Sequence, residues 1–61
     1  MTIYSITNNT INERYADGFA SIQQAVWYLI SHTSKSDRDC HIYQVWHYDD
    51  NNNVVIDWSN R

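Results

Sequence analysis

The chain has 61 residues, with no proline, one glycine and one cysteine, and its four basic and seven acidic residues give a net charge of −3. A chain of this length forms one domain, residues 1–61, with a thin margin of stability, and a lone cysteine excludes an intramolecular disulfide. No apolar run approaches the roughly 20 residues of a membrane span and no signal peptide is recognisable, so we expect a cytoplasmic protein without membrane association.

The N-terminal segment predicts one strand and a possible second. Thr2–Thr7 is rich in β-branched residues and tyrosine, which favour extended structure. Asn8-Asn9 suits a tight turn, because asparagine tolerates positive φ. Ile11–Ala16 then returns as a second strand that ends at Asp17-Gly18. Because the middle of this segment is polar and favours strands poorly, a three-stranded sheet without it is the alternative.

An amphipathic helix is predicted from Ser21 to the region of His32–Ser34. The Ser21 hydroxyl can accept from the Gln24 amide while the Gln24 side chain returns to the Ser21 amide, which is a capping box. Five apolar residues recur with helical spacing and form one stripe: Ile22, Ala25, Val26, Leu29 and Ile30. The polar run at residues 31–37 is expected to begin a loop.

The C-terminal third of the chain predicts a β-hairpin. From Cys40 to Tyr48 the polarity alternates with period two, residues 49–53 have the composition of a turn, and Val54–Trp58 forms the returning strand. A hairpin centred on Asn51 pairs Tyr48 with Val54, Trp46 with Ile56 and Gln44 with Trp58. This register collects the largest apolar side chains on one face, which we expect to lie beneath the helix.

These elements predict an α+β fold of two layers. One amphipathic helix packs on a three- to four-stranded antiparallel sheet, in the order β-(β)-α-β-β. The expected core combines the stripe of the helix with the large apolar side chains of the strands, and Phe19 closes it at the start of the helix. Its members are Ile6, Ile22, Val26, Leu29, Ile30, Ile42, Trp46, Ile56 and Trp58.

A single helix covers only one face of a sheet, so the other face is the candidate binding surface. In the predicted register it carries His41, Tyr43, Val45, His47, Val55 and Asp57. A modest apolar patch with a polar rim is typical of an interaction surface, although a plain solvated sheet face is the alternative. Trp27 lies about 130° from the centre of the helical stripe. It is a further candidate partner-binding residue, unless it folds down over Ile30 and the sheet edge.

The histidines do not predict a metal or catalytic centre. His41 and His47 are six residues apart on one strand, roughly 20 Å at 3.3 Å per residue, which is too far for one ion, so we expect no metal and no cofactor. His47 and Asp57 share a face and resemble a base with its orienting carboxylate. No nucleophile or phosphate-binding loop accompanies them, and we therefore expect no enzyme.

The sequence favours a small non-catalytic protein that binds another protein and acts by occlusion. In size, acidity and lack of catalytic residues it resembles, in general type, the small host-directed inhibitors of bacteriophages and mobile elements, including anti-defence proteins; no specific residue carries this resemblance. A homodimeric structural or assembly subunit is one alternative. A small RNase-like nucleic-acid module using His41, Tyr43 and His47 is another. Scattered basic residues disfavour nucleic acid as a partner: Arg14, Lys35, Arg38 and Arg61.

Overall fold

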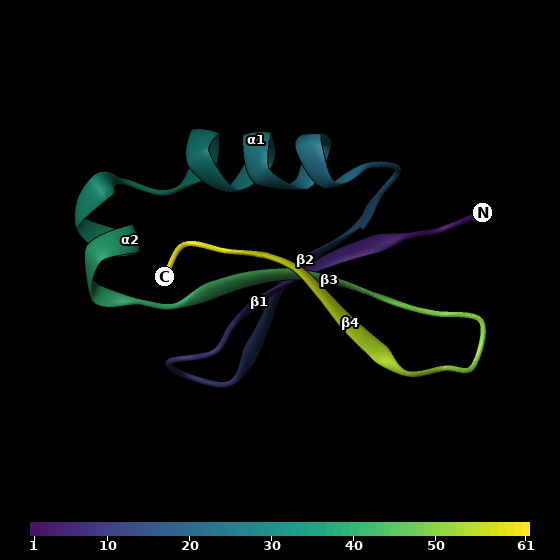
Figure 1. The fold of residues 1–61 in the computed structure, drawn as a ribbon. Helices are drawn as coiled ribbons and strands as arrows, with labels where there is room; N and C mark the ends of the chain where they lie inside the picture. The colour runs from purple at the N-terminus through teal and green to yellow at the C-terminus, as the bar shows by residue number, and fades with distance from the viewer.

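The computed structural model describes residues 1–61 and contains a four-stranded antiparallel sheet with a helix on one face (Figure 1). In chain order the elements are β1 (Tyr4–Asn8), β2 (Glu13–Phe19), α1 (Ile22–His32), α2 (Lys35–Cys40), β3 (Tyr43–Tyr48) and β4 (Val54–Ser59). The strands lie in the order β2-β1-β3-β4. The predicted α+β class with one helix on an antiparallel sheet is confirmed, and the sheet has the larger of the two expected strand numbers. Neither helix is long and apolar enough to cross a bilayer.

The second strand exists but is displaced along the chain from its predicted range of 11–16. β2 runs from Glu13 to Phe19 and passes through Gly18 instead of ending there. Gly18 has a φ of 88°, a conformation that glycine adopts without steric cost. Two register shifts against β1 accommodate this irregular backbone, and as a result Ile6 lies opposite Ala16.

Helix α1 begins at the predicted cap. The Ser21 hydroxyl accepts from the Gln24 amide at 3.1 Å, which satisfies one of the free amides of the first turn. The Gln24 side chain accepts from the amide of Ala20 at 3.2 Å, one residue before the partner expected for a capping box. Ala25 and Leu29 are fully buried, so the centre of the predicted stripe faces the sheet.

The polar run at residues 31–37, predicted to begin a loop, instead leads into the short helix α2. Its cap is a complete capping box: the Asp37 amide donates to Ser34 Oγ and the Ser34 amide donates to Asp37 Oδ2, each at 3.0 Å. No residue of α2 is buried. Asn60 ties it to the sheet, because its Nδ2 donates to the Arg38 carbonyl at 2.9 Å and its Oδ1 accepts from the Tyr43 amide at 2.7 Å.

The hairpin packs under α1 with the opposite face from the one predicted. Ile42 and Ile56 are 36% and 49% exposed, and Ile30 of the helix is 50% exposed; Trp46 is partly buried outside the core cluster. Other members of the predicted core, Phe19, Ile22, Val26 and Trp58, pack partly buried against it. The buried apolar residues are Ile6, Ala25, Leu29, Tyr43 and Val45.

The register of the hairpin explains part of this reversal. The pairs Tyr48–Val54 and Trp46–Ile56 form as predicted, but a shift between Val45 and Trp46 places Gln44 opposite Ser59 instead of Trp58. Trp58 therefore pairs with Val45 on the helix side, while Trp46 and Ile56 stay on the other face. The narrow buried stripe of α1, Ala25 and Leu29, packs over Ile6, Tyr43 and Val45 of the sheet.

Candidate functional site

Two of the predicted partner-binding residues lie in the core. Tyr43 is 4% exposed and Val45 is fully buried, both beneath α1. The expectation that they line an uncovered sheet face is wrong, because that face of the hairpin is the one that α1 covers. Burial and edge-on ring packing hold Tyr43 in place, with its ring centroid 5.6 Å from that of Tyr15.

His47, Val55 and Asp57 lie on the same side of the sheet as Tyr43 and Val45. His47 Nδ1 and Asp57 Oδ2 are 2.7 Å apart, and the two side chains are only 20% and 11% exposed. The Tyr4 ring packs edge-on against the imidazole at 5.3 Å between centroids. Val55 lies opposite His47 and is 36% exposed. The histidine–aspartate contact thus links β3 to β4 and orients His47.

His41 lies in the segment between α2 and β3. Its carbonyl accepts from Asn60 Nδ2 at 2.9 Å, and its ring lies 6.2 Å from that of Tyr43. His41 therefore belongs to the junction of α2 with the sheet and not to an uncovered face. Nowhere in the fold do three or more histidine, cysteine or acidic side chains gather in an arrangement that could hold a metal ion.

The uncovered face of the sheet instead carries the large apolar side chains that the sequence pattern assigned to the core. Because side chains alternate along a strand, Trp46 and Tyr48 lie opposite in orientation to the buried Val45, and their cross-strand partners Ile56 and Val54 lie with them. Ile3 lines a shallow hollow beside Tyr48. We call these residues the open-face patch: Ile3, Trp46, Tyr48, Val54 and Ile56.

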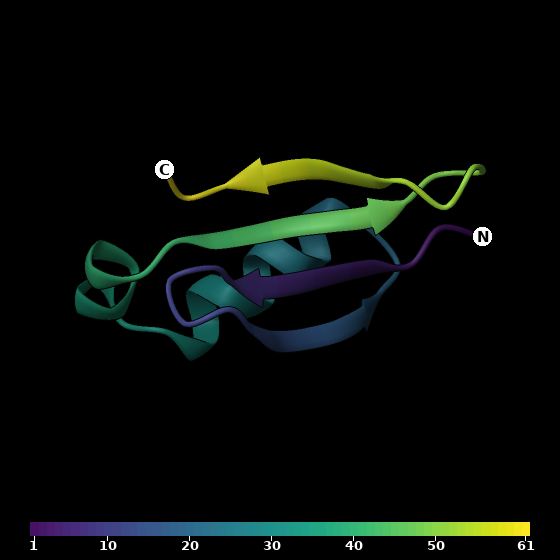
Figure 2. The same cartoon turned by 90° about the horizontal axis from the view of Figure 1, so that it is seen from below.

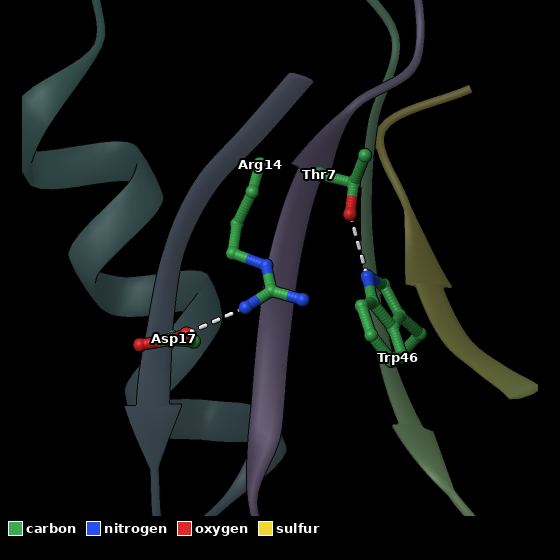
Figure 3. A network of polar contacts seen from close by, with 4 residues as sticks. All are labelled: Thr7, Arg14, Asp17 and Trp46. Atoms are coloured by element: carbon green, nitrogen blue, oxygen red, sulfur yellow. Dashed lines mark hydrogen bonds and ion pairs between the residues drawn. The ribbon is translucent and has the colours of Figure 1, made fainter. Parts of the chain in front are cut away.

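The aromatic residues of the open-face patch are held by specific contacts. Trp46 Nε1 donates to Thr7 Oγ1 at 2.6 Å, across from β3 to β1 (Figure 3). The rings of Trp46 and Tyr48 pack at right angles with centroids 5.0 Å apart. The exposed fractions of Tyr48, Val54 and Ile56 are 56%, 53% and 49%. A rigid indole whose polar group is already satisfied, surrounded by exposed apolar groups, has the character of a binding anchor.

A charged strip borders this patch on the same face. Arg14 lies opposite Thr7 and Asp17 opposite Ser5, so both project away from α1, as Figure 3 shows. Arg14 and Asp17 form an ion pair at 3.0 Å with exposed side chains. The face is therefore divided into an apolar half on β3 and β4 and a charged half on β2, with Ser5 and Thr7 of β1 between them.

Trp27 projects beside an apolar groove on the other side of the sheet. It is 68% exposed, so it does not fold down into the core. Together with Trp58 of β4 it lines a groove of about 590 Å³ along the flank of α1. The remaining lining residues are Ile22, Gln23, Val26, Ile30 and Ser31. Of the two alternatives that the sequence left open for Trp27, the structure has the exposed one, beside a groove between a helix and an edge strand.

Three titratable groups have perturbed pKa values. Burial raises the pKa of Tyr15, with a further rise from the neighbouring Tyr28, and burial likewise raises the pKa of Tyr43. Hydrogen bonds from Ser34 lower the pKa of the exposed Asp37, because they stabilise its charged form. These groups belong to the core and to the cap of α2, so their pKa values bear on stability.

The sequence contains two signals that indicate this site. Val54, Val55 and Ile56 are consecutive apolar residues in a short strand, so one face of the strand must carry apolar groups away from any single helix. Trp46 lies opposite Ser5 and diagonally from Thr7, and Trp46 and Thr7 can share a hydrogen bond only on the face away from α1. The position of Trp58 in the groove depends on the register shift, and no local sequence pattern predicts that shift.

Comparison of the chain with protein-family models, with curated proteins and with solved structures gives no match.

Proposed function

We propose that this protein binds another protein through the open-face patch and acts by covering part of its partner's surface. The observation that carries the proposal is the exposure of Tyr48, Val54 and Ile56 together on one sheet face, at 56%, 53% and 49%. Contiguous exposed apolar groups on a small domain mark interaction sites more often than single ones do. The chain exposes these apolar groups although its core contains only five buried apolar residues.

The geometry suits a rigid docking surface. Trp46 is held by Thr7 and by the Tyr48 ring, so little side-chain entropy is lost when a partner packs against it. The paired Arg14 and Asp17 form a polar border on the same face, and such a rim contributes more to specificity than to affinity. An apolar centre with a polar border is the usual arrangement of a protein–protein interface.

We further propose that the partner is a host or defence protein and that this chain is an inhibitor of the kind bacteriophages and mobile elements encode. What supports this is the small size and acidic balance of the chain. The exposed free cysteine, Cys40, suits a reducing compartment such as the cytoplasm. Nucleic acid is a less suitable partner, because Arg14, the basic residue beside the patch, is already paired with Asp17.

The test is a comparison of three tagged proteins in pull-downs from a bacterial lysate, read by mass spectrometry. The wild type is compared with Tyr48→Lys, which places a charge in the patch, and with Ile11→Lys, which makes the same kind of change at a 52% exposed residue in the β1–β2 turn. Far-UV circular dichroism confirms that all three are folded.

We expect the wild type and Ile11→Lys to retain the same protein in stoichiometric amounts and Tyr48→Lys to lose it. Equal retention by a folded Tyr48→Lys variant would contradict the proposal, as would capture of RNA or DNA in place of a protein.

A further inference from the structure

The two edges of the sheet differ in how they resist pairing with another strand. The β2 edge carries Glu13, Arg14 and Asp17, contains Gly18 at a φ of 88°, and is irregular in register. Charges, irregular backbone and bulges are the devices by which proteins protect an edge strand. β2 is therefore a protected edge.

The β4 edge lacks this protection in its first half. Val54, Val55 and Ile56 are 53%, 36% and 49% exposed, and they follow one another without a charged residue, glycine or proline. The one charge in the strand, Asp57, turns inward to His47. The register shift affects only the second half, around Asp57 and Trp58. An exposed apolar edge strand is a template for a further strand.

The apolar groove runs along this same edge. In Figure 2, α1 lies behind the other strands of the sheet, and β4 forms the edge that α1 leaves uncovered. Trp27 and Ile30 form the helical wall of the groove, and Trp58 forms its floor. Trp27 and Ile30 are 68% and 50% exposed. The unpaired backbone of β4 and these side chains therefore lie along the same edge of the molecule.

We infer that two copies of this chain associate by pairing β4 with β4 in antiparallel orientation, which joins their sheets into one of eight strands. The two-fold axis passes close to Val55, the centre of the unprotected segment. Both α1 helices then lie on the same face of the joined sheet, and the two grooves meet across the axis. Trp27 and Ile30 of each copy become enclosed between the helices. One symmetry operation thus covers the free edge, Val55 and the groove.

The charges at the two ends of β4 favour this occupant. With Val55 on the axis, the Asp49–Asn53 turn of one copy lies beside Ser59 and Asn60 of the other. There a polar hollow is lined by Lys35 and Arg38, together with Asp39. Arg38 Nη1 donates to the neutral carbonyl oxygens of Ile30 and Thr33, so its charge is not neutralised by these contacts. Asp49 and Asp50 of one copy therefore face two cations and one carboxylate of the other.

The available surface is sufficient for such a dimer. A stable interface covers about 800 Å² on each partner, which is about a fifth of the 4196 Å² that the chain exposes. One long side of a molecule measuring 35 × 20 × 16 Å can supply this area through the edge, the flank of α1 and the end of α2. This inference goes beyond the proposed function, because pairing along β4 leaves the open-face patch uncovered and doubles it into one continuous surface.

Sedimentation equilibrium of the purified full chain tests the inference. We expect a mass of about twice 7.3 kDa for the wild type and a dimer dissociation constant raised about tenfold or more in Val55→Lys and in Trp27→Glu. Ile11→Lys is the matched control and keeps the wild-type constant. A wild type that is monomeric at high micromolar concentration overturns the inference. So does a dimer whose dissociation constant is the same in the wild type, in Val55→Lys and in Trp27→Glu.

Cross-linking tests the register of the pairing. In a Cys40→Ser background, Val55→Cys is expected to form a disulfide-linked dimer under mild oxidation, since residues facing each other in antiparallel strands have Cβ atoms about 4.5–5.5 Å apart. Ile11→Cys in the same background serves as the control for random collision. Equal cross-linking of the two variants overturns the inference.

The two proposals fail separately. Tyr48→Lys alters the open-face patch and is expected to keep the wild-type dissociation constant of the dimer. Val55→Lys alters the helix-side edge and leaves the side chains of the patch in place. If Tyr48→Lys abolishes the dimer while Val55→Lys does not, the two copies pack face to face, and the edge pairing is overturned.

Discussion

Val45 lies opposite Trp58, and this pairing places the largest side chain of β4 on the face covered by α1. The register shift between Val45 and Trp46 produces it, since without the shift Trp58 would lie opposite Gln44 on the other face. Trp58 then packs against the core while forming the floor of the groove. One local irregularity therefore connects the stability of the domain to the shape of its groove.

Replacing Trp58 with alanine is expected to lower the free energy of unfolding by about 2 kcal/mol, less than for a fully buried tryptophan because Trp58 is only partly buried. Trp27→Ala is the control of equal size. Because Trp27 is 68% exposed, its loss is expected to change the unfolding free energy by about 0.5 kcal/mol or less. Urea titration at low micromolar concentration measures both. Similar losses for the two variants would show that Trp58 does not anchor the hairpin to the core.

The contact between His47 and Asp57 is expected to stabilise the sheet more than the ion pair between Arg14 and Asp17. Asp57→Ala leaves a largely buried imidazole without its partner, at a cost of about 1–3 kcal/mol. Asp17→Ala breaks an exposed pair, which contributes about 0–1 kcal/mol. Chemical denaturation of the two variants gives the comparison, and equal effects would rule out a stabilising role for the buried pair.

The protein is expected to lose stability at alkaline pH. Burial raises the pKa of Tyr43 and of Tyr15 above their ordinary value of 10.0, so the folded state holds these protons more tightly than the unfolded state does. The resulting stability is fully present below pH 10 and declines as the pH rises through the folded-state values. Thermal melts between pH 8 and 12 follow it. Tyr43→Phe should weaken the decline, and a slope identical to that of the wild type would refute the assignment to Tyr43.

Acid is expected to loosen α2. Hydrogen bonds from Ser34 hold the pKa of Asp37 below its ordinary value of 3.8, so the cap stabilises the fold above that pH and the contribution is lost as the pH falls through the folded-state value. Asp37→Ala removes the carboxylate that accepts from the Ser34 amide. Comparison of its acid unfolding with that of the wild type, by circular dichroism, should show that the variant has lost this pH-dependent component. Superimposable normalised curves would contradict the prediction.

Much of the fold follows from local sequence patterns. Ser21 and the apolar spacing that follows it predicted α1 where it occurs, because capping and helical periodicity act within a few residues. The alternation around Trp46 and the turn at residues 49–53 likewise predicted the hairpin and two of its pairs. The pattern Ser34-Lys35-Ser36-Asp37 held the same kind of information for α2, and the absence of an apolar stripe concealed it.

The placement of the candidate site depended on contacts that no local pattern contains. Alternation shows that Tyr43 and Val45 share one face and that Trp46 and Tyr48 share the other, and it does not show which face meets the helix. Both faces carry apolar side chains. The prediction placed the face with the larger ones, Trp46 and Ile56, beneath the helix, but this face is the uncovered one. Five of the seven predicted binding residues were therefore assigned to the wrong side of the sheet. The other two are Trp27, which lies on the helix, and His41, which lies at the junction of α2 with the sheet.

The sequence by itself determined the α+β class, the start of α1 and the hairpin, because these arise from interactions between residues close together in the chain. Only the tertiary structure decided which face of the hairpin is buried. That choice combines the narrow Ala25–Leu29 stripe of α1, the pairing of Ile6 with Val45, the hydrogen bond from Trp46 to Thr7 and the shift that carries Trp58 to the helix side. The contacts of Ile6 with Val45 and of Thr7 with Trp46 join β1 to β3, which are far apart in the sequence, so the outcome is set only when the chain packs.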